Sequence, residues 1–159
     1  MLKRIICLVI CLVLVGGVLS GCNGEEINRD TTDKIPDATV FQDFMVEKDV
    51  TLTAKDVQYD MINTLDQSFA IEGNAILSDY YNYGFKESMS KLIFVIRVTP
   101  TSKDYSDSWY LYCDRESFVN LFDELKEQGE INIFAKCLIP KALYQENQGN
   151  MALVESISW

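Results

Sequence analysis

The chain has 159 residues, of which 48% are apolar and 24% charged, which fits one globular domain and leaves no room for two. Its 14 basic and 24 acidic residues give a formal net charge of -10, the opposite of what a general nucleic-acid binder needs against phosphates. There is no histidine, so Ser-His-Asp triads, histidine-ligated zinc and imidazole base catalysis are excluded. We identify no catalytic residue, metal-ligand set or cofactor motif.

The first 21 residues have the pattern of an export signal. Lys3 and Arg4 precede the apolar run 5–18, and three small or apolar residues then lead into Cys22. Because charge, apolar length and cysteine position agree, we expect residues 1–21 to be a lipoprotein signal peptide. The alternative is an uncleaved membrane anchor, since about 17 to 25 apolar residues can span a bilayer.

The stretch Leu19-Ser20-Gly21-Cys22 resembles the lipobox of bacterial lipoproteins. That resemblance implies cleavage before Cys22 and a diacylglycerol thioether on its sulfur, with fatty acyl chains such as palmitate. Two or more acyl chains anchor a protein durably. The sequence therefore predicts an extracytoplasmic protein that partners a bacterial membrane, either the cell membrane or the outer membrane, through the lipid on Cys22.

Residues 22–39 are polar, lack apolar periodicity and include Pro36, as is typical of a disordered tether. We expect the single folded domain to span 40–159. Without the signal peptide the chain has 12 basic and 24 acidic residues, a net charge of -12 that would repel anionic headgroups.

Two interpretations fit residues 53–65. Thr53 and Asp56 have the spacing of a capping box, and apolar residues follow at helical intervals. Apolar and polar residues also alternate from 56 to 61, as in a half-buried strand. We favour a short helix, whose apolar positions would be Ala54, Val57, Met61 and Leu65.

Three strands are predicted next. Phe69–Asp79 alternates apolar and polar residues, with Gly73 at a position where a bent strand often has a bulge or kink. Leu92–Thr99 is nearly all apolar and β-branched, and the polar turn 100–107 leads into a strand at Ser108–Cys113. Together these segments predict a meander.

A helix and two strands complete the domain. Asp114 offers an N-cap and Gly129 a stop, and the helix between them carries an apolar stripe. Glu130–Ile139 alternates as a strand, and a polar loop leads to a last strand at Met151–Ser158. The apolar stripe that we expect in the core consists of Phe118, Leu121, Phe122 and Leu125.

The order β-β-β-α-β-β within about 90 residues is that of the OB-fold, a five-stranded Greek-key barrel. The fold class is therefore mainly β, with one helix in the barrel and a short helix before it. The segments Phe69–Ala75, Asp114–Gly129 and Glu130–Lys136 resemble those of bacterial lipoprotein and periplasmic OB proteins related to tRNA-anticodon-binding domains, the tRNA_anti-like family. The resemblance implies a binding scaffold and brings no active site.

Five residues are candidates for ligand binding on this barrel. The loop after the first strand is rich in tyrosine, and strand alternation places further polar and aromatic side chains on the outer face. Such a platform could stack on sugars, bases or protein side chains. The alternative is that the rings only cover the barrel ends. The candidates are Tyr81, Tyr83, Arg97, Tyr110 and Tyr112.

Two further features have structural explanations. Asp104, Asp107 and their serine neighbours could supply calcium ligands, but they lack the glycine and glutamate of an EF-hand loop and favour a hairpin turn. Cys113 and Cys137 are the only cysteines after Cys22. They are disulfide candidates, yet the third and fourth strands of an OB barrel are not neighbours, so we favour two buried free thiols.

The sequence thus predicts a membrane-tethered, non-catalytic binding or interaction module. Its expected partner is an envelope protein or glycan, and nucleic acid is disfavoured by the charge. The alternative is a cell-envelope hydrolase that uses carboxylates.

Overall fold

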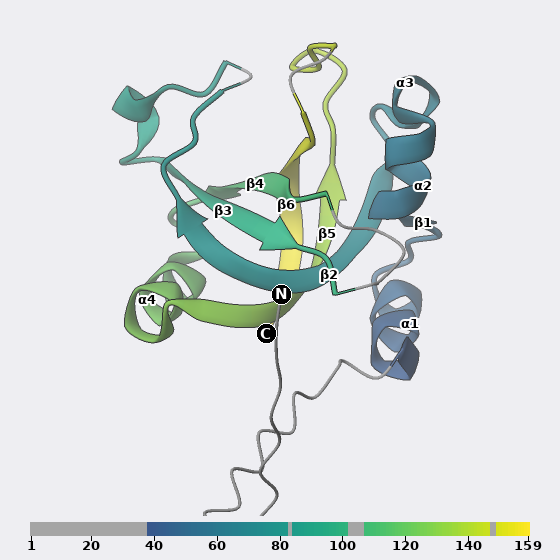
Figure 1. Cartoon of the computed structure of the whole chain (residues 1–159), viewed down its shortest axis with the longest axis horizontal. Coiled ribbons are helices and arrows are strands. Elements are labelled where there is room, and N and C mark those ends of the chain that lie inside the picture. The colour runs from purple at the N-terminus through teal and green to yellow at the C-terminus, as the bar shows by residue number, and fades with distance from the viewer. Residues whose placement is uncertain (1–37, 83, 102–106, 147–148) are drawn as a thin grey trace, which may run out of the picture. The chain divides into compact units, whose positions relative to one another are not determined.

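The computed structural model describes residues 38–82, 84–101, 107–146 and 149–159 (Figure 1). Within these ranges the chain folds into a closed five-stranded mixed β-barrel with one additional strand and a few helices. The barrel strands are β2 (Ser68–Ser78), β3 (Ile93–Thr99), β4 (Trp109–Asp114), β5 (Glu130–Leu138) and β6 (Met151–Ser158).

The barrel closes in the order β2-β3-β4-β6-β5, with β5 pairing back onto β2. The β4–β6 pairing is parallel, and the other barrel pairings are antiparallel. The helix α4 (Val119–Gln128) lies between the third and fourth barrel strands in the chain. The predicted OB-like architecture, with its β-β-β-α-β-β order, is therefore confirmed.

Five further elements lie outside this pattern. The strand β1 (Leu52–Thr53) runs parallel to the beginning of β2. The helices are α1 (Ala38–Glu47), α2 (Ala54–Tyr59) and α3 (Met61–Thr64), and a single 3-10 turn, η1 (Glu87–Met89), lies in the loop between β2 and β3. Among the described residues, no helix is long and apolar enough to cross a membrane.

Strand β2 curves along the whole barrel and contacts both β3 and β5 (Figure 1). Its register with β5 is regular through Gly73, which pairs with Ile133, so no bulge occurs there. A Cβ atom on Gly73 would lie 2.3 Å from the carbonyl oxygen of Thr99. The glycine is therefore required because the chain leaving β3 crosses directly over it.

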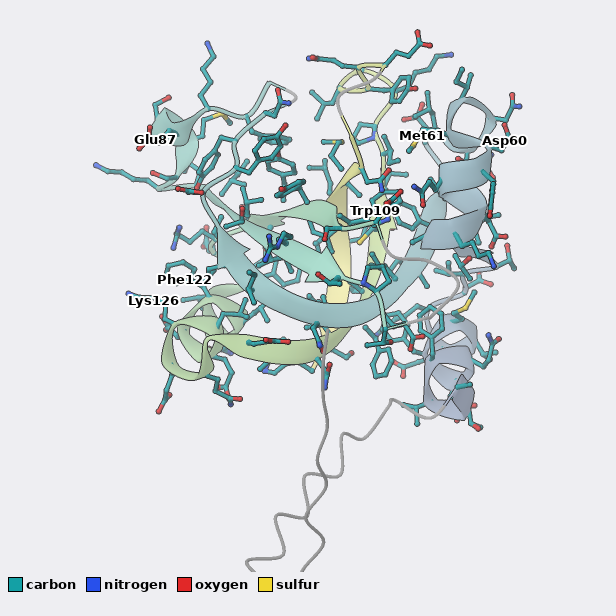
Figure 2. The ribbon with its side chains drawn as sticks, viewed as in Figure 1. Asp60, Met61, Glu87, Trp109, Phe122 and Lys126 are labelled. Carbon is teal, nitrogen blue, oxygen red and sulfur yellow. The ribbon has the colours of Figure 1, made fainter. Side chains whose placement is uncertain are left out.

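The main core fills the barrel with aromatic and β-branched side chains. The rings of Phe69 and Trp109 lie 5.1 Å apart between centroids, and both side chains are fully buried. Figure 2 shows Trp109 in the middle of the strands. Ile71, Ile96 and Leu111 join them from three different strands, so the interior is a packed core.

Helix α1 covers part of the outside of the barrel, and we did not predict it. Phe44 and Met45 are buried against Ala70 of β2, and the ring of Phe41 stacks on Phe134 of β5 with centroids 6.0 Å apart. The helix begins at Ala38, inside the stretch 22–39 predicted as a tether. The rest of that stretch and the signal peptide lie outside the described residues.

The helical interpretation of residues 53–65 is confirmed, but the segment forms two short helices, α2 and α3, with a break at Asp60. Asp56 N donates to Thr53 Oγ1 at 3.3 Å, while Thr53 N donates to Asp56 Oδ2 at 2.8 Å, which is the reciprocal capping box. The Thr53 hydroxyl also donates to Asp56 Oδ2 at 2.6 Å, and this hydrogen bond, together with the one from Thr53 N, lowers the pKa of Asp56. Ala54 and Val57 are buried in the main core, so α2 is fixed by both its cap and its apolar side.

Helix α4 begins later than predicted. The backbone N of Ser117 donates to Asp114 Oδ1 at 2.8 Å, so Asp114 caps the turn that precedes the helix, which starts at Val119. Gly129, with φ of +82°, ends it as expected. The four residues of the predicted stripe all contact the core, but only Leu121 and Leu125 are fully buried, whereas Phe118 and Phe122 are half-buried.

Cys113 and Cys137 are buried free thiols, as favoured from the sequence. Burial raises the pKa of both groups, and the proximity of Cys113 raises that of Cys137 further. Both thiols therefore stay protonated in the folded barrel.

Candidate functional site: an aromatic groove on the outer face of the barrel

A row of three side chains crosses the outer face of β2, β3 and β4. Ile76 is the register partner of Arg97, and Arg97 is the partner of Tyr110. Directly opposite residues of antiparallel strands share a face, so these three side chains lie next to one another. Arg97 is exposed, and Ile76 and Tyr110 are half-buried. The predicted outward placement of Arg97 and Tyr110 is confirmed.

Tyr80 completes this row from the loop that follows β2. Its ring lies 4.3 Å from that of Tyr110 between centroids, at an interplanar angle of 34°. Asn82 Nδ2 donates to the Tyr80 hydroxyl at 2.9 Å, which fixes the orientation of the phenol. Tyr80 is still 37% exposed, so the ring pair presents aromatic surface to solvent.

The tyrosine pair and Arg97 line an open groove of about 730 Å³. Asp79 adds a carboxylate to its lining, and Phe122 of α4 closes one side. Figure 2 shows Phe122 one turn before Lys126 on that helix. We call this surface the aromatic groove; it is defined by Ile76, Asp79, Tyr80, Arg97, Tyr110 and Phe122.

Tyr112 does not face solvent, contrary to our expectation. Its side chain is only 2% exposed, because the loop after β2 folds over the outer face of β4 and covers it. Asn82 N donates to the Tyr112 hydroxyl at 3.1 Å, and that hydroxyl donates to Tyr80 O at 3.3 Å. Burial raises the pKa of Tyr112 to about 12. Tyr112 thus holds the loop that carries Tyr80.

Tyr81 also points into the structure. Its hydroxyl donates to the carbonyl oxygen of Ile93 at 3.3 Å, and its half-buried ring packs against the main core. Burial raises its pKa. Of the predicted set, the structure brings together Arg97 and Tyr110 in the groove. Tyr112 lies beneath the loop after β2, and Tyr81 belongs to that loop with its side chain turned inward. Tyr83 and Cys22 lie outside the described residues.

We did not predict from the sequence that Tyr80 lines the groove, although strand alternation indicates it. Ile76 and Ser78 lie on the outer face, and Tyr80 continues the same alternation beyond the end of β2. The groove wall formed by Phe122 had no such signal, because its position in the apolar stripe of α4 predicts burial in the core.

The predicted calcium alternative at 104–108 falls mainly outside the described residues. Asp107 is described, and it accepts a hydrogen bond from Gln58 Nε2 of α2. This contact joins the end of the turn to the helix, which is a structural role. Within the described part of the chain, no group of three or more cysteine, aspartate or glutamate side chains could hold a metal ion.

Comparisons of the chain with protein-family models, with curated proteins and with solved structures found no match.

Proposed function

We propose that this chain is a lipid-anchored extracytoplasmic protein whose barrel is a non-catalytic module that binds a neutral glycan of the bacterial envelope. The observation that carries this proposal is the Tyr80–Tyr110 ring pair beside the exposed Arg97 in an open groove. OB-folds bind oligosaccharides and oligonucleotides on the outer face of the same strands and with the adjoining loops.

The chemistry of the groove favours a sugar. Aromatic faces stack on the apolar faces of pyranose rings, and the nearby guanidinium and carboxylate of Arg97 and Asp79 supply hydrogen-bond donors and acceptors for hydroxyl groups. A net charge of -12 without the signal peptide opposes a polyanion such as nucleic acid. An envelope protein is the competing ligand class, which the experiment below distinguishes.

The anchoring part of the proposal is supported by the sequence from Lys3 to Cys22, with its basic start, apolar run and lipobox. The order of strands around the barrel supports a relationship to the bacterial OB lipoproteins related to tRNA-anticodon-binding domains. We propose that family relationship on the fold order and the three resembling segments together.

We prefer binding to hydrolysis because of where carboxylates lie. Hydrolysis by two carboxylates needs both groups on opposite sides of one scissile bond. The aromatic groove has Asp79 as the carboxylate in its lining, and a second, smaller cavity has Glu72. Neither lining contains a pair among the described residues. A third cavity is lined by both Asp114 and Glu116, but these two carboxylates are exposed to solvent.

The test is binding of the purified protein to an array of neutral envelope oligosaccharides. Tyr80→Ala and Tyr110→Ala should each weaken binding about tenfold, because each removes part of the stacking surface. Tyr59→Ala is the matched control, since Tyr59 lies on α2 and is 81% exposed. It should leave the affinity unchanged. The melting temperature should change little in Tyr59→Ala and Tyr80→Ala, whose rings are exposed, and should fall in Tyr110→Ala, whose half-buried ring packs against the core.

Two results would contradict the proposal. Equal loss of binding in the Tyr59 variant would show that the array measures general adhesion to tyrosine. Absence of any glycan binding, with a protein crosslinked through Tyr80 or Tyr110 in intact envelopes, would replace the glycan by a protein ligand.

A further inference from the structure

The side chains of the aromatic groove lie in a fixed order across three strands. Ile76 of β2 is the register partner of Arg97 of β3, and Arg97 is the partner of Tyr110 of β4. Directly opposite residues are neighbours on one face, with Cβ atoms about 4.5–5.5 Å apart. The ring of Tyr80 lies beside that of Tyr110, with centroids 4.3 Å apart. The groove therefore presents an aromatic pair, a guanidinium and an aliphatic side chain, in that order.

Arg97 offers hydrogen-bond donors in the middle of this order. Its side chain is exposed to solvent, so a ligand in the groove can reach it. A guanidinium carries five N–H donors and no acceptor. A sugar ring that stacks on the two tyrosines therefore meets donors at its edge, and the substituent that points toward Arg97 has to carry an acceptor.

Ile76, on the far side of Arg97, disfavours a hydroxyl group as the end of that substituent. Its side chain is half-buried and lines the groove. A hydroxyl group placed against it would lose contact with water and gain no hydrogen bond, which is unfavourable. A methyl group at the same place would gain from the removal of apolar surface from water. The order of side chains thus fits an acceptor next to the ring and a methyl group beyond it.

Asp79 argues against an acidic acceptor. It also lines the groove, and its side chain is exposed. Like charges brought together across an interface repel, so a carboxylate on the ligand would be opposed by Asp79 even though Arg97 attracts it. The carbonyl oxygen of an amide accepts a hydrogen bond from a guanidinium and carries no charge. A methyl-bearing amide, which is an acetamido group, meets all of these requirements.

We propose that the glycan bound by the aromatic groove carries acetamido groups. A pyranose ring stacks on Tyr80 and Tyr110, the amide carbonyl of its substituent accepts a hydrogen bond from Arg97, and the methyl group lies against Ile76. This inference rests on the proposed function, because it names the substituent of the neutral glycan proposed there. It makes Arg97 and Ile76 the residues that set specificity.

The experiment measures the affinity of the full chain for three oligosaccharides by isothermal titration calorimetry, in micelles of a detergent without a sugar headgroup. Chitotetraose and cellotetraose share one linkage and differ only in carrying an acetamido or a hydroxyl group on each ring. Tetragalacturonate carries carboxylates instead. We expect chitotetraose to bind about tenfold more tightly than cellotetraose, and tetragalacturonate not to bind.

Two variants test the role of the guanidinium. Arg97→Met keeps an aliphatic stem and removes the donors, so the preference for chitotetraose over cellotetraose should fall from about tenfold to less than about twofold. Lys141→Met removes a positive charge at an exposed position after β5, outside the groove lining, and should keep the preference.

Four outcomes would overturn the inference. Equal affinities for chitotetraose and cellotetraose would show that the acetamido group is not recognised, while the glycan-binding function would stand. An unchanged preference in Arg97→Met would remove the guanidinium from recognition. Tighter binding of tetragalacturonate would show that an acidic substituent is recognised instead. Absence of binding to all three probes and to every glycan of the array would overturn the proposed function as well.

Discussion

The phenol ring of Tyr112 stacks on the ring of Phe85, with centroids 4.3 Å apart and planes 19° from parallel. Tyr112 belongs to the barrel wall, and Phe85 belongs to the loop after β2. The stack and the two hydrogen bonds of the Tyr112 hydroxyl therefore join the loop to the barrel at one residue. The position of Tyr80 in the aromatic groove depends on these contacts of Tyr112.

Tyr112→Phe should change the response of the protein to alkaline pH. The pKa of Tyr112 is about 12 in the folded protein and about 10 in the unfolded chain, so the folded state retains its proton more strongly. The resulting stabilisation is complete below pH 10 and is lost as the pH rises toward 12. Urea titrations across this range should show a shallower fall in the free energy of unfolding for Tyr112→Phe.

Tyr59→Phe provides the control for this experiment, because Tyr59 is 81% exposed. Its slope with pH should match that of the unaltered protein. At neutral pH, Tyr112→Phe should also lose about 0.5–1.5 kcal/mol from its hydrogen bonds. Identical slopes for the unaltered protein and Tyr112→Phe would mean that the hydroxyl is not protected from ionisation.

Gly73→Ala should lower the free energy of unfolding by about 1–3 kcal/mol. The added methyl group would meet backbone atoms, with Thr99 C at 2.8 Å and Pro100 Cα at 2.9 Å, and a backbone crossing cannot move aside as a side chain can. Asn74→Ala, at the next position of β2, should change stability by less than about 0.5 kcal/mol in the same denaturant titration. A Gly73→Ala protein as stable as the Asn74 variant would contradict the close crossing.

Leu121→Ala should lower the free energy of unfolding more than Phe122→Ala, although phenylalanine is the larger side chain. Leu121 is fully buried, so its truncation should cost about 2–5 kcal/mol. Phe122 is half-buried and contacts the Phe94 ring and the Arg115 guanidinium. Its truncation should cost about 2 kcal/mol, less than the roughly 3–5 kcal/mol expected of a fully buried phenylalanine. Equilibrium denaturation of both variants measures the order, and a larger loss for Phe122→Ala would place it in the core after all.

Cys22→Ser should prevent lipid attachment and move the protein out of the detergent-extractable membrane fraction or leave it unprocessed. The reason is that the lipobox resemblance assigns the thioether to the Cys22 sulfur. Cys11→Ser, in the apolar run, is the control and should be processed normally. Mass spectrometry and fractionation measure both properties. A Cys22→Ser protein cleaved at the same bond and still in the membrane fraction would show that no lipid is needed.

The sequence was sufficient for the barrel because each barrel strand has an alternating or a continuous apolar pattern that is bounded by turn residues. Met151–Ser158 coincides with β6, and Glu130–Ile139 differs from β5 by one residue. Helix α1 was not predicted, although Phe41, Phe44 and Met45 have helical spacing. The helix and strand interpretations were both applied to residues 53–65, and no element was assigned to the residues before them.

The candidate site could be predicted only in part. Strand alternation predicts that Arg97 and Tyr110 lie on the outer face, and the structure confirms this placement. Alternation cannot reveal that a loop folds back over the same face, which buries Tyr112 and turns the Tyr81 hydroxyl inward. Such coverage is a tertiary effect that no local pattern encodes.

The two protonated thiols inside the barrel make it possible to measure the opening of the barrel by chemical labelling. A thiol reagent reacts with thiolates, so Cys113 and Cys137 can be alkylated only in molecules whose strands have separated. When the reagent is concentrated enough for labelling to be faster than reclosing, the labelling rate of these cysteines in the purified protein equals the rate of opening. Ligands that close the barrel more tightly would slow that rate without needing any spectroscopic signal of their own.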